Sequence, residues 1–225
     1  LPVKINTIDA SLCAKMFLAG AKNLESKKEW INELNVFPVP DGDTGVNMSL
    51  TIGAAAKALT GSADHTVTEV ADLVASSVLK GARGNSGVIL SILFRGIAKG
   101  LKGLETADGR QFAAAYRQGV EAAYKAVMKP SEGTILTVAR VSCEKACEAA
   151  QEEDDFLTIF RLILAQAKET LQQTPEMLPV LKKANVVDAG GKGLITIFEG
   201  MLALLETGEI IAAEETAESA EKADF

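Results

Sequence analysis

Apolar residues recur at helical spacing along almost the whole chain, and this periodicity limits what it can fold into. The clearest stripe comprises Phe156, Phe160, Ile163, Leu164, Ala167 and Leu171. Spacings of three and four place all six on one helix face. The same pattern, or strong helix formers, predicts helices over 8–24, 26–34, 45–60, 66–80, 86–102, 109–127, 134–150, 155–172, 175–184 and 191–206.

No segment shows the alternating pattern of a half-buried strand, and aromatic residues make up only 5% of the chain. We therefore expect an all-α fold in which short loops place successive helices antiparallel. Asp9 and Ser26 are the expected N-caps of the first two helices.

The chain is predicted to form one domain over residues 1–207. From Gly208 it reads GEIIAAEETAESAEKADF, an acidic segment that we expect to be a solvated tail or a linker to a further domain. The chain begins at Leu1 instead of Met, which suggests a piece of a longer protein.

Composition excludes several classes of protein. A net charge of −7 argues against broad binding to nucleic acid, and apolar runs are too short for a transmembrane segment. Cys13, Cys143 and Cys147 lack the further ligands of a zinc site, so we expect thiols in a reducing cytoplasm.

Three glycine-rich loops interrupt the helical pattern, and each directly precedes a predicted helix. Their sequences are PVPDGDTG at 38–45, GARGNSG at 81–87 and DAGGKG at 188–193. Glycines in turns and C-caps would explain one such loop. Three of them favour an anion site, because helix N-termini present unpaired N–H groups and glycine lets a phosphate approach the backbone.

Asp41 and Asp43 place two carboxylates in one sharply bending loop. Neighbouring carboxylates repel unless a cation lies between them, and hard oxygen ligands suit Mg²⁺. An Asx turn that caps the next helix would account for one of the two aspartates. The chain lacks the Walker, dinucleotide-binding and protein-kinase motifs.

The run NVFPVPDGDTGVNM at 35–48 closely resembles the signature of the nucleotide-binding domain of bacterial fatty acid kinases. That domain is of one family with the nucleotide-binding subunit of dihydroxyacetone kinase. GARGNSGVI at 81–89, KPSEGTILT at 129–137 and VDAGGKG at 187–193 are also similar. The resemblance implies a closed barrel of about eight antiparallel helices, with ATP or ADP and two Mg²⁺ ions at one end.

The resemblance also implies roles for individual residues. The catalytic metal ligands would be Asp41 and Asp43, with Asn35 where the dihydroxyacetone kinase branch carries a further aspartate. The phosphate contacts would come from Thr44, Asn47, Asn85, Ser86 and Gly87. The remaining nucleotide contacts would be Ile89 against adenine, Thr134, and a rim of Asp188, Gly190 and Gly191.

Three functions follow as hypotheses. The first is a fatty acid kinase domain whose acyl substrate arrives on a separate lipid-carrying protein, with a homodimer formed through further domains. The second is the nucleotide-binding subunit of a dihydroxyacetone kinase, with the substrate held by a partner. The third is a regulatory domain that retains nucleotide without turnover.

Overall fold

The computed structural model describes residues 4–63 and 65–210, which are predominantly helical. The prediction of an all-α fold is confirmed. The described residues form the helices α1 (Ala10–Glu33), α2 (Thr44–Leu59), α3 (Val67–Gly81), α4 (Gly84–Gly100), α5 (Gly109–Ala126), α6 (Ile135–Ala149), α7 (Phe156–Met177), α8 (Pro179–Ala184) and α9 (Ala189–Thr207).

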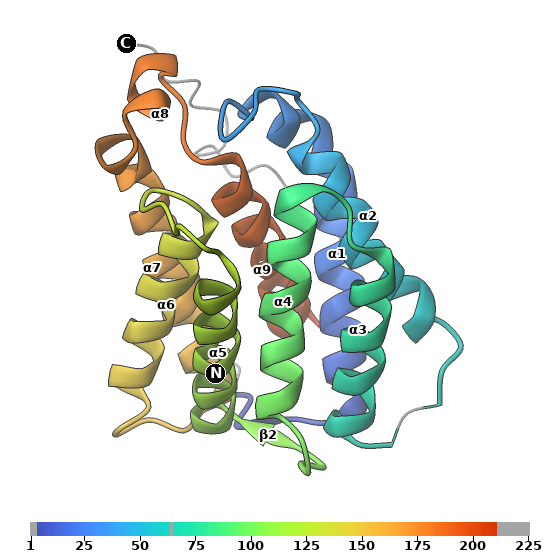
Figure 1. Cartoon of the computed structure of the whole chain (residues 1–225). Coiled ribbons are helices and arrows are strands. Elements are labelled where there is room, and N and C mark those ends of the chain that lie inside the picture. Colours follow the sequence, from blue (N-terminus) through green and yellow to red (C-terminus); the bar gives the residue numbers. More distant parts are fainter. Residues whose placement is uncertain (1–3, 64, 211–225) are drawn as a thin grey trace.

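The eight long helices form a closed ring. Each of α1 to α7 packs on the next one in sequence, α9 packs on α7, and α9 also packs on α1 to close the ring (Figure 1). The short helix α8 lies outside it and contacts α7. The predicted barrel of about eight antiparallel helices is therefore the observed architecture.

One end of the ring is tied by a short β pair. Residues Thr7–Ile8 (β1) and Ala107–Asp108 (β2) pair antiparallel, at the opposite end from the loops that precede α2, α4, α6 and α9 (Figure 1). Two residues per strand are too few to show an alternating pattern, so neither strand could be predicted from the sequence.

An aromatic cluster fills the centre of the α5–α7–α9 side. Phe160 packs edge-on against Phe198 with ring centroids 5.5 Å apart, and Tyr116 does the same at 5.9 Å. The buried Tyr116 hydroxyl shares a 2.9 Å hydrogen bond with Ser142 Oγ, which satisfies both polar groups.

The predicted helix break at Ser26 is wrong. A single helix, α1, covers both predicted segments and begins at the expected N-cap Asp9, whose carboxylate accepts from Leu12 N–H at 2.8 Å. Ser26 lies inside α1 and donates to the Asn23 carbonyl at 2.7 Å. A serine can cap a helix or bond back within one, and nothing near Ser26 breaks the helix.

A helix was also predicted to begin at Pro175, and this too is wrong. Pro175 lies inside α7, which continues to Met177. A proline within a helix has no N–H for the carbonyl four residues earlier. Here that carbonyl belongs to Leu171, and it accepts a hydrogen bond from the Thr174 hydroxyl at 2.7 Å instead. The threonine supplies the donor that the proline lacks, so the helix continues.

Two further features of the described helices bear on the predictions. None of them combines the length and apolar character needed to cross a membrane. On α6 the Sγ atoms of Cys143 and Cys147 lie 4.0 Å apart on one helix face, and burial raises the pKa of the Cys143 thiol. The predicted domain division stays a prediction, because residues 211–225 lie outside the described residues.

Glycines let α4 and α5 pack backbone to backbone. A Cβ added to Gly119 would lie 2.5 Å from the Leu93 carbonyl oxygen, and one added to Gly96 would lie 2.5 Å from Gly119 Cα. By contrast, a Cβ added to Gly53 inside α2 would meet no atom within 4 Å. Gly119 and Gly53 therefore form a matched pair for testing the packing of α4 against α5.

We expect Gly119→Ala to lower the free energy of unfolding by about 1–3 kcal/mol, because the methyl group forces α4 and α5 apart. Gly53→Ala should raise it by about 0.4–1 kcal/mol, because alanine loses less backbone entropy on folding. Urea denaturation of both variants measures the difference. Equal effects at the two positions would contradict the close α4–α5 packing.

Candidate functional site

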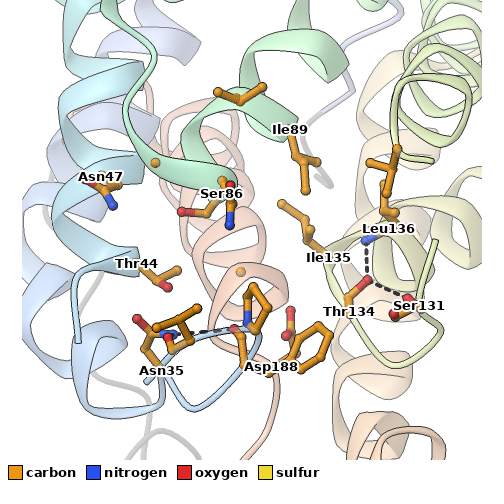
Figure 2. A pocket seen from close by; sticks show the side chains of 18 of the residues that line it. Asn35, Thr44, Asn47, Ser86, Ile89, Ser131, Thr134, Ile135, Leu136 and Asp188 are labelled. Atoms are coloured by element: carbon orange, nitrogen blue, oxygen red, sulfur yellow. Dashed lines mark hydrogen bonds between the residues drawn. The ribbon is translucent and has the colours of Figure 1, made fainter. Parts of the chain in front are cut away.

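One cavity of about 540 Å³ opens at the end of the ring opposite the β pair. The first turns of α2, α4 and α6 line it, together with the N-cap and first turn of α9 (Figure 2). The loop between α1 and α2 and the loop between α5 and α6 complete its wall. Four helix N-termini therefore face a single space of the size that binds a small organic ligand.

Most of the residues predicted for the site line this cavity. They are Asn35, Asp41, Asp43, Thr44, Asn47, Asn85, Ser86, Ile89, Thr134, Asp188 and Gly190. Gly87 and Gly191 do not line it, because both face the helix packing: a Cβ on Gly87 would collide with Thr51, and one on Gly191 would lie 2.9 Å from Val138 Cγ2.

Asn35 organises the loop that carries the two aspartates. Its side chain is buried, its Oδ1 accepts from Asp43 N–H at 3.1 Å, and its Nδ2 donates to the Val39 carbonyl at 3.1 Å. The amide thus holds both sides of the 36–43 loop. Its predicted role as a metal ligand stays a prediction. The amide oxygen that would bind the metal already accepts one hydrogen bond.

Asp43 is the N-cap residue of α2, yet its side chain makes no capping hydrogen bond. Its carboxyl group instead faces Asp41, which is exposed, and hydrogen bonding to Asp43 raises the pKa of Asp41. The Asx-turn explanation therefore does not account for Asp43. Within the described part of the chain, His, Cys, Asp and Glu nowhere gather in a group of three or more that could bind a metal.

The N-terminus of α4 also begins without a side-chain cap. Its N-cap residue, Arg83, makes no such bond, while the Arg83 N–H donates to Thr51 Oγ1 at 3.2 Å. Gly84 follows with a φ of +64°, and an added Cβ would collide with Asn47. Only glycine fits this turn, which brings Asn85 and Ser86 to the cavity.

Side-chain capping separates these two helices from the other long ones. An Asp or Thr side chain accepts from a first-turn N–H in each of α1, α3, α5, α6, α7 and α9. Among the described long helices, the N-cap residues of α2 and α4 make no such bond, although the Asn32 side chain of α1 accepts from Val46 N–H in the first turn of α2 at 3.1 Å. Both point their first turns into the cavity, where an anion could accept from them.

Asp188 caps α9 at the centre of the cavity floor (Figure 2). Its buried Oδ2 accepts from Gly191 N–H at 2.8 Å, and its own N–H donates to Thr174 Oγ1 at 3.1 Å. Burial raises the pKa of Asp188 to about 6, although backbone hydrogen bonds from Gly191 and Ile135 oppose the increase.

Of the apolar side of the cavity, sequence reasoning assigned only Ile89. Ile135 and Leu136 lie with Ile89 across the cavity from Thr44 and Asn47 (Figure 2). Val127, Lys129 and Ser131 also line the cavity. The run at 129–137 was the available signal, but of its residues only Thr134 was assigned to the site.

A family model described as the DAK2 domain matches residues 38–203, about three quarters of the chain. The chain belongs to the DAK2 domain family. This DAK2 domain is 47% identical over 210 residues to an uncharacterized protein of Staphylococcus saprophyticus, and 46% identical over 209 residues to Protein YloV of Bacillus subtilis. Each match covers 93% of this chain and 38% of the relative, so the domain spans well under half of these proteins.

The fold matches a solved structure described as dihydroxyacetone kinase from C. freundii in complex with AMP-PNP and Mg²⁺. The TM-score is 0.66 with 16% sequence identity, and the match covers 89% of this chain and 35% of that one. The native form of the same enzyme matches with a TM-score of 0.64. At this identity the likeness establishes the shared fold.

Asp188 gives the domain a pH-dependent stability. Because folding raises its pKa from 3.8 to about 6, its contribution is fully present below pH 4 and is lost as the pH rises through 6. In Asp188→Asn, which keeps an oxygen for Gly191 N–H, we expect that decline to be smaller by about 1–3 kcal/mol. Urea denaturation of both proteins at pH 4, 5, 6 and 7 measures it. If the free energy of unfolding of the two proteins changes with pH in parallel, Asp188 is not the source of the decline.

Proposed function

We propose that this DAK2 domain binds ATP or ADP together with Mg²⁺ and serves as the nucleotide domain of a kinase. The observation that carries the proposal is that the N-cap residues of α2 and α4 make no capping hydrogen bond at a cavity that also holds Asp41 and Asp43. Uncapped N–H groups attract an anion and adjacent carboxylates attract a cation. A phosphate chain with bound Mg²⁺ satisfies both.

The two sides of the cavity match the two halves of a nucleotide. The polar side, with Thr44, Asn47 and Ser86, suits the phosphates. The apolar side, with Ile89, Ile135 and Leu136, suits the flat face of a base. The dihydroxyacetone kinase of the same fold is described with AMP-PNP and Mg²⁺, which supports this ligand class.

The residues present fit Mg²⁺. Asp41 and Asp43 would hold it through carboxylate oxygens, and phosphate oxygens and water would complete a shell that needs no third acidic residue. Bound there, Mg²⁺ would neutralise charge on the phosphates during transfer. A second ion, as the resemblance implies, is part of the same proposal.

The acceptor we favour is a fatty acid presented by a separate lipid-carrying protein. The described residues that line the cavity include no histidine, and Asp188 is committed to capping α9. A carboxylate acceptor is already ionised at neutral pH, so it needs no general base. Transfer would then depend on positioning and charge neutralisation.

Dihydroxyacetone, held by a partner subunit, is the second candidate, because a dihydroxyacetone kinase shares the fold. A hydroxyl acceptor must lose a proton during transfer, and a partner would have to supply the base for it. The fatty acid therefore ranks first. Dimerisation through further domains of the longer relatives also belongs to the proposal.

We expect Asp41→Asn and Asp43→Asn to abolish Mg²⁺-dependent binding of ADP while leaving the fold intact. Removing either charge relieves the repulsion between the two carboxylates, so neither variant should unfold more easily without ligand. Calorimetric titration with and without MgCl₂ measures binding. Asp72→Asn, an exposed aspartate on α3, is the control. Wild-type affinity in both site variants would contradict the metal assignment.

This chain alone should bind ATP yet catalyse transfer poorly, since alignment of acceptor and γ-phosphate supplies most of the rate. Acyl-phosphate formation should appear with a fatty acid on a lipid-carrying protein when the full-length relative is used. Dihydroxyacetone in parallel reactions tests the second candidate. Binding without transfer to either acceptor by the full-length protein would favour a regulatory domain that retains nucleotide.

A further inference from the structure

The loop from Val127 to Thr134 forms part of the cavity wall and leads into the apolar first turn of α6. Val127, Lys129, Ser131 and Thr134 all line the cavity, and Ile135 and Leu136 follow directly in α6. The loop has no helical hydrogen bonds of its own to hold it. Its position over the cavity therefore depends on side-chain contacts with α5 and α6 and on the packing of Gly133 against Met177 and Leu178 at the end of α7.

Glu132 supplies most of those contacts although it does not line the cavity. Its Oε2 accepts from Thr137 Oγ1 at 2.6 Å and from an Arg140 guanidinium nitrogen at 3.0 Å. Its Oε1 accepts from the Tyr124 hydroxyl at 3.2 Å. Partial burial would raise the pKa of Glu132, but the hydrogen bonds from Thr137 and Arg140 outweigh it and the pKa is lowered.

The partners of Glu132 are linked in turn to the loop and to each other. Arg140 Nε donates to the Tyr124 hydroxyl at 3.1 Å, which joins α6 to α5. Thr137 Oγ1, oriented by its bond to Glu132, accepts from Gly133 N–H at 2.8 Å. The Thr134 hydroxyl then bonds Ser131 and Leu136 (Figure 2). One carboxylate thus fixes a chain of contacts that ends at cavity-lining residues.

Stability alone does not account for this network. The side chains of Glu132 and Arg140 are 49% and 37% exposed, and ion pairs at such exposure add little to the free energy of unfolding. The effect of the network on the position of the loop is different, because a cavity wall displaced by a fraction of an ångström changes the fit of a ligand. The network is expected to matter for binding far more than for folding.

We propose that Glu132, through Tyr124, Thr137 and Arg140, is a positioning residue that sets the place of the 127–134 loop and so the width of the slot for the nucleotide base. This inference rests on the proposed function, because it takes the bound ligand to be a nucleotide. Glu132 acts through the loop and touches no ligand itself. The metal side of the cavity, at Asp41 and Asp43, is built from other elements and is independent of it.

The test compares Glu132→Gln with Glu206→Gln, which breaks an equally exposed ion pair, Arg161–Glu206 (2.9 Å), between α7 and α9. Calorimetry with ADP and MgCl₂ gives the dissociation constant, and differential scanning calorimetry without ligand gives the Tm. Glu132→Gln should raise the dissociation constant about tenfold, the size of one lost hydrogen bond to a charged group. The Tm and the Mg²⁺ concentration for half-saturation should stay near wild type. Glu206→Gln should change none of the three.

A double-mutant cycle with Arg140→Gln adds a readout that a merely structural role would not move. If both side chains act through one loop, the double variant should bind ADP about as weakly as either single variant. Additive losses, unchanged affinity in Glu132→Gln, or weaker binding that only follows a lower Tm would each overturn the proposal. Absence of ADP binding in the wild-type chain would instead refute the proposed function, and this inference with it.

Discussion

The contact between the first and the last long helix is the constraint on which the rest of the structure depends. A Cβ added to Gly20 of α1 would lie 2.8 Å from Ile197 Cγ2, and one added to Gly200 of α9 would lie 2.5 Å from the Ala19 carbonyl oxygen. Buried Asn23 reinforces the contact by donating to the Thr196 carbonyl at 2.7 Å. Without this close approach the eight-helix ring would stay open between α1 and α9.

Ring closure also places the parts of the site together. α1 leads into the loop that holds Asn35 and Asp41, and α9 starts at Asp188, so antiparallel packing of the two brings both loops to one end. Segments about 150 residues apart in sequence meet there. The cavity therefore exists because the order of the helices in the ring brings these loops together. Which groups it offers to a ligand depends on which helix N-termini have a capping side chain and which do not.

Local patterns predicted the helices, because an apolar stripe and a strong cap at Asp9 are properties of short segments. They failed where a side chain had two possible partners: Ser26 bonds back within α1, and Pro175 is accommodated by its neighbour. In the site, glycine and aspartate gave clear signals through their backbone and charge. Val127 and Leu136 gave none, since an apolar residue in a cavity wall resembles one in the core. The partners of Glu132 lie close to it in sequence, but they stand on two helices and a loop, so no single periodicity relates them.

Thr174 connects the proline inside α7 with the start of α9. Its single buried hydroxyl donates to the Leu171 carbonyl beside Pro175 and accepts from the N–H of Asp188. Positions 174 and 175 are therefore chemically dependent on each other. Proline at 175 is tolerated while a hydroxyl stands before it, and that hydroxyl in turn anchors the start of α9. Among related sequences we expect residues 174 and 175 to change together. Variation at these two positions of α7 should be limited, because Thr174 also supports Asp188 in the cavity floor.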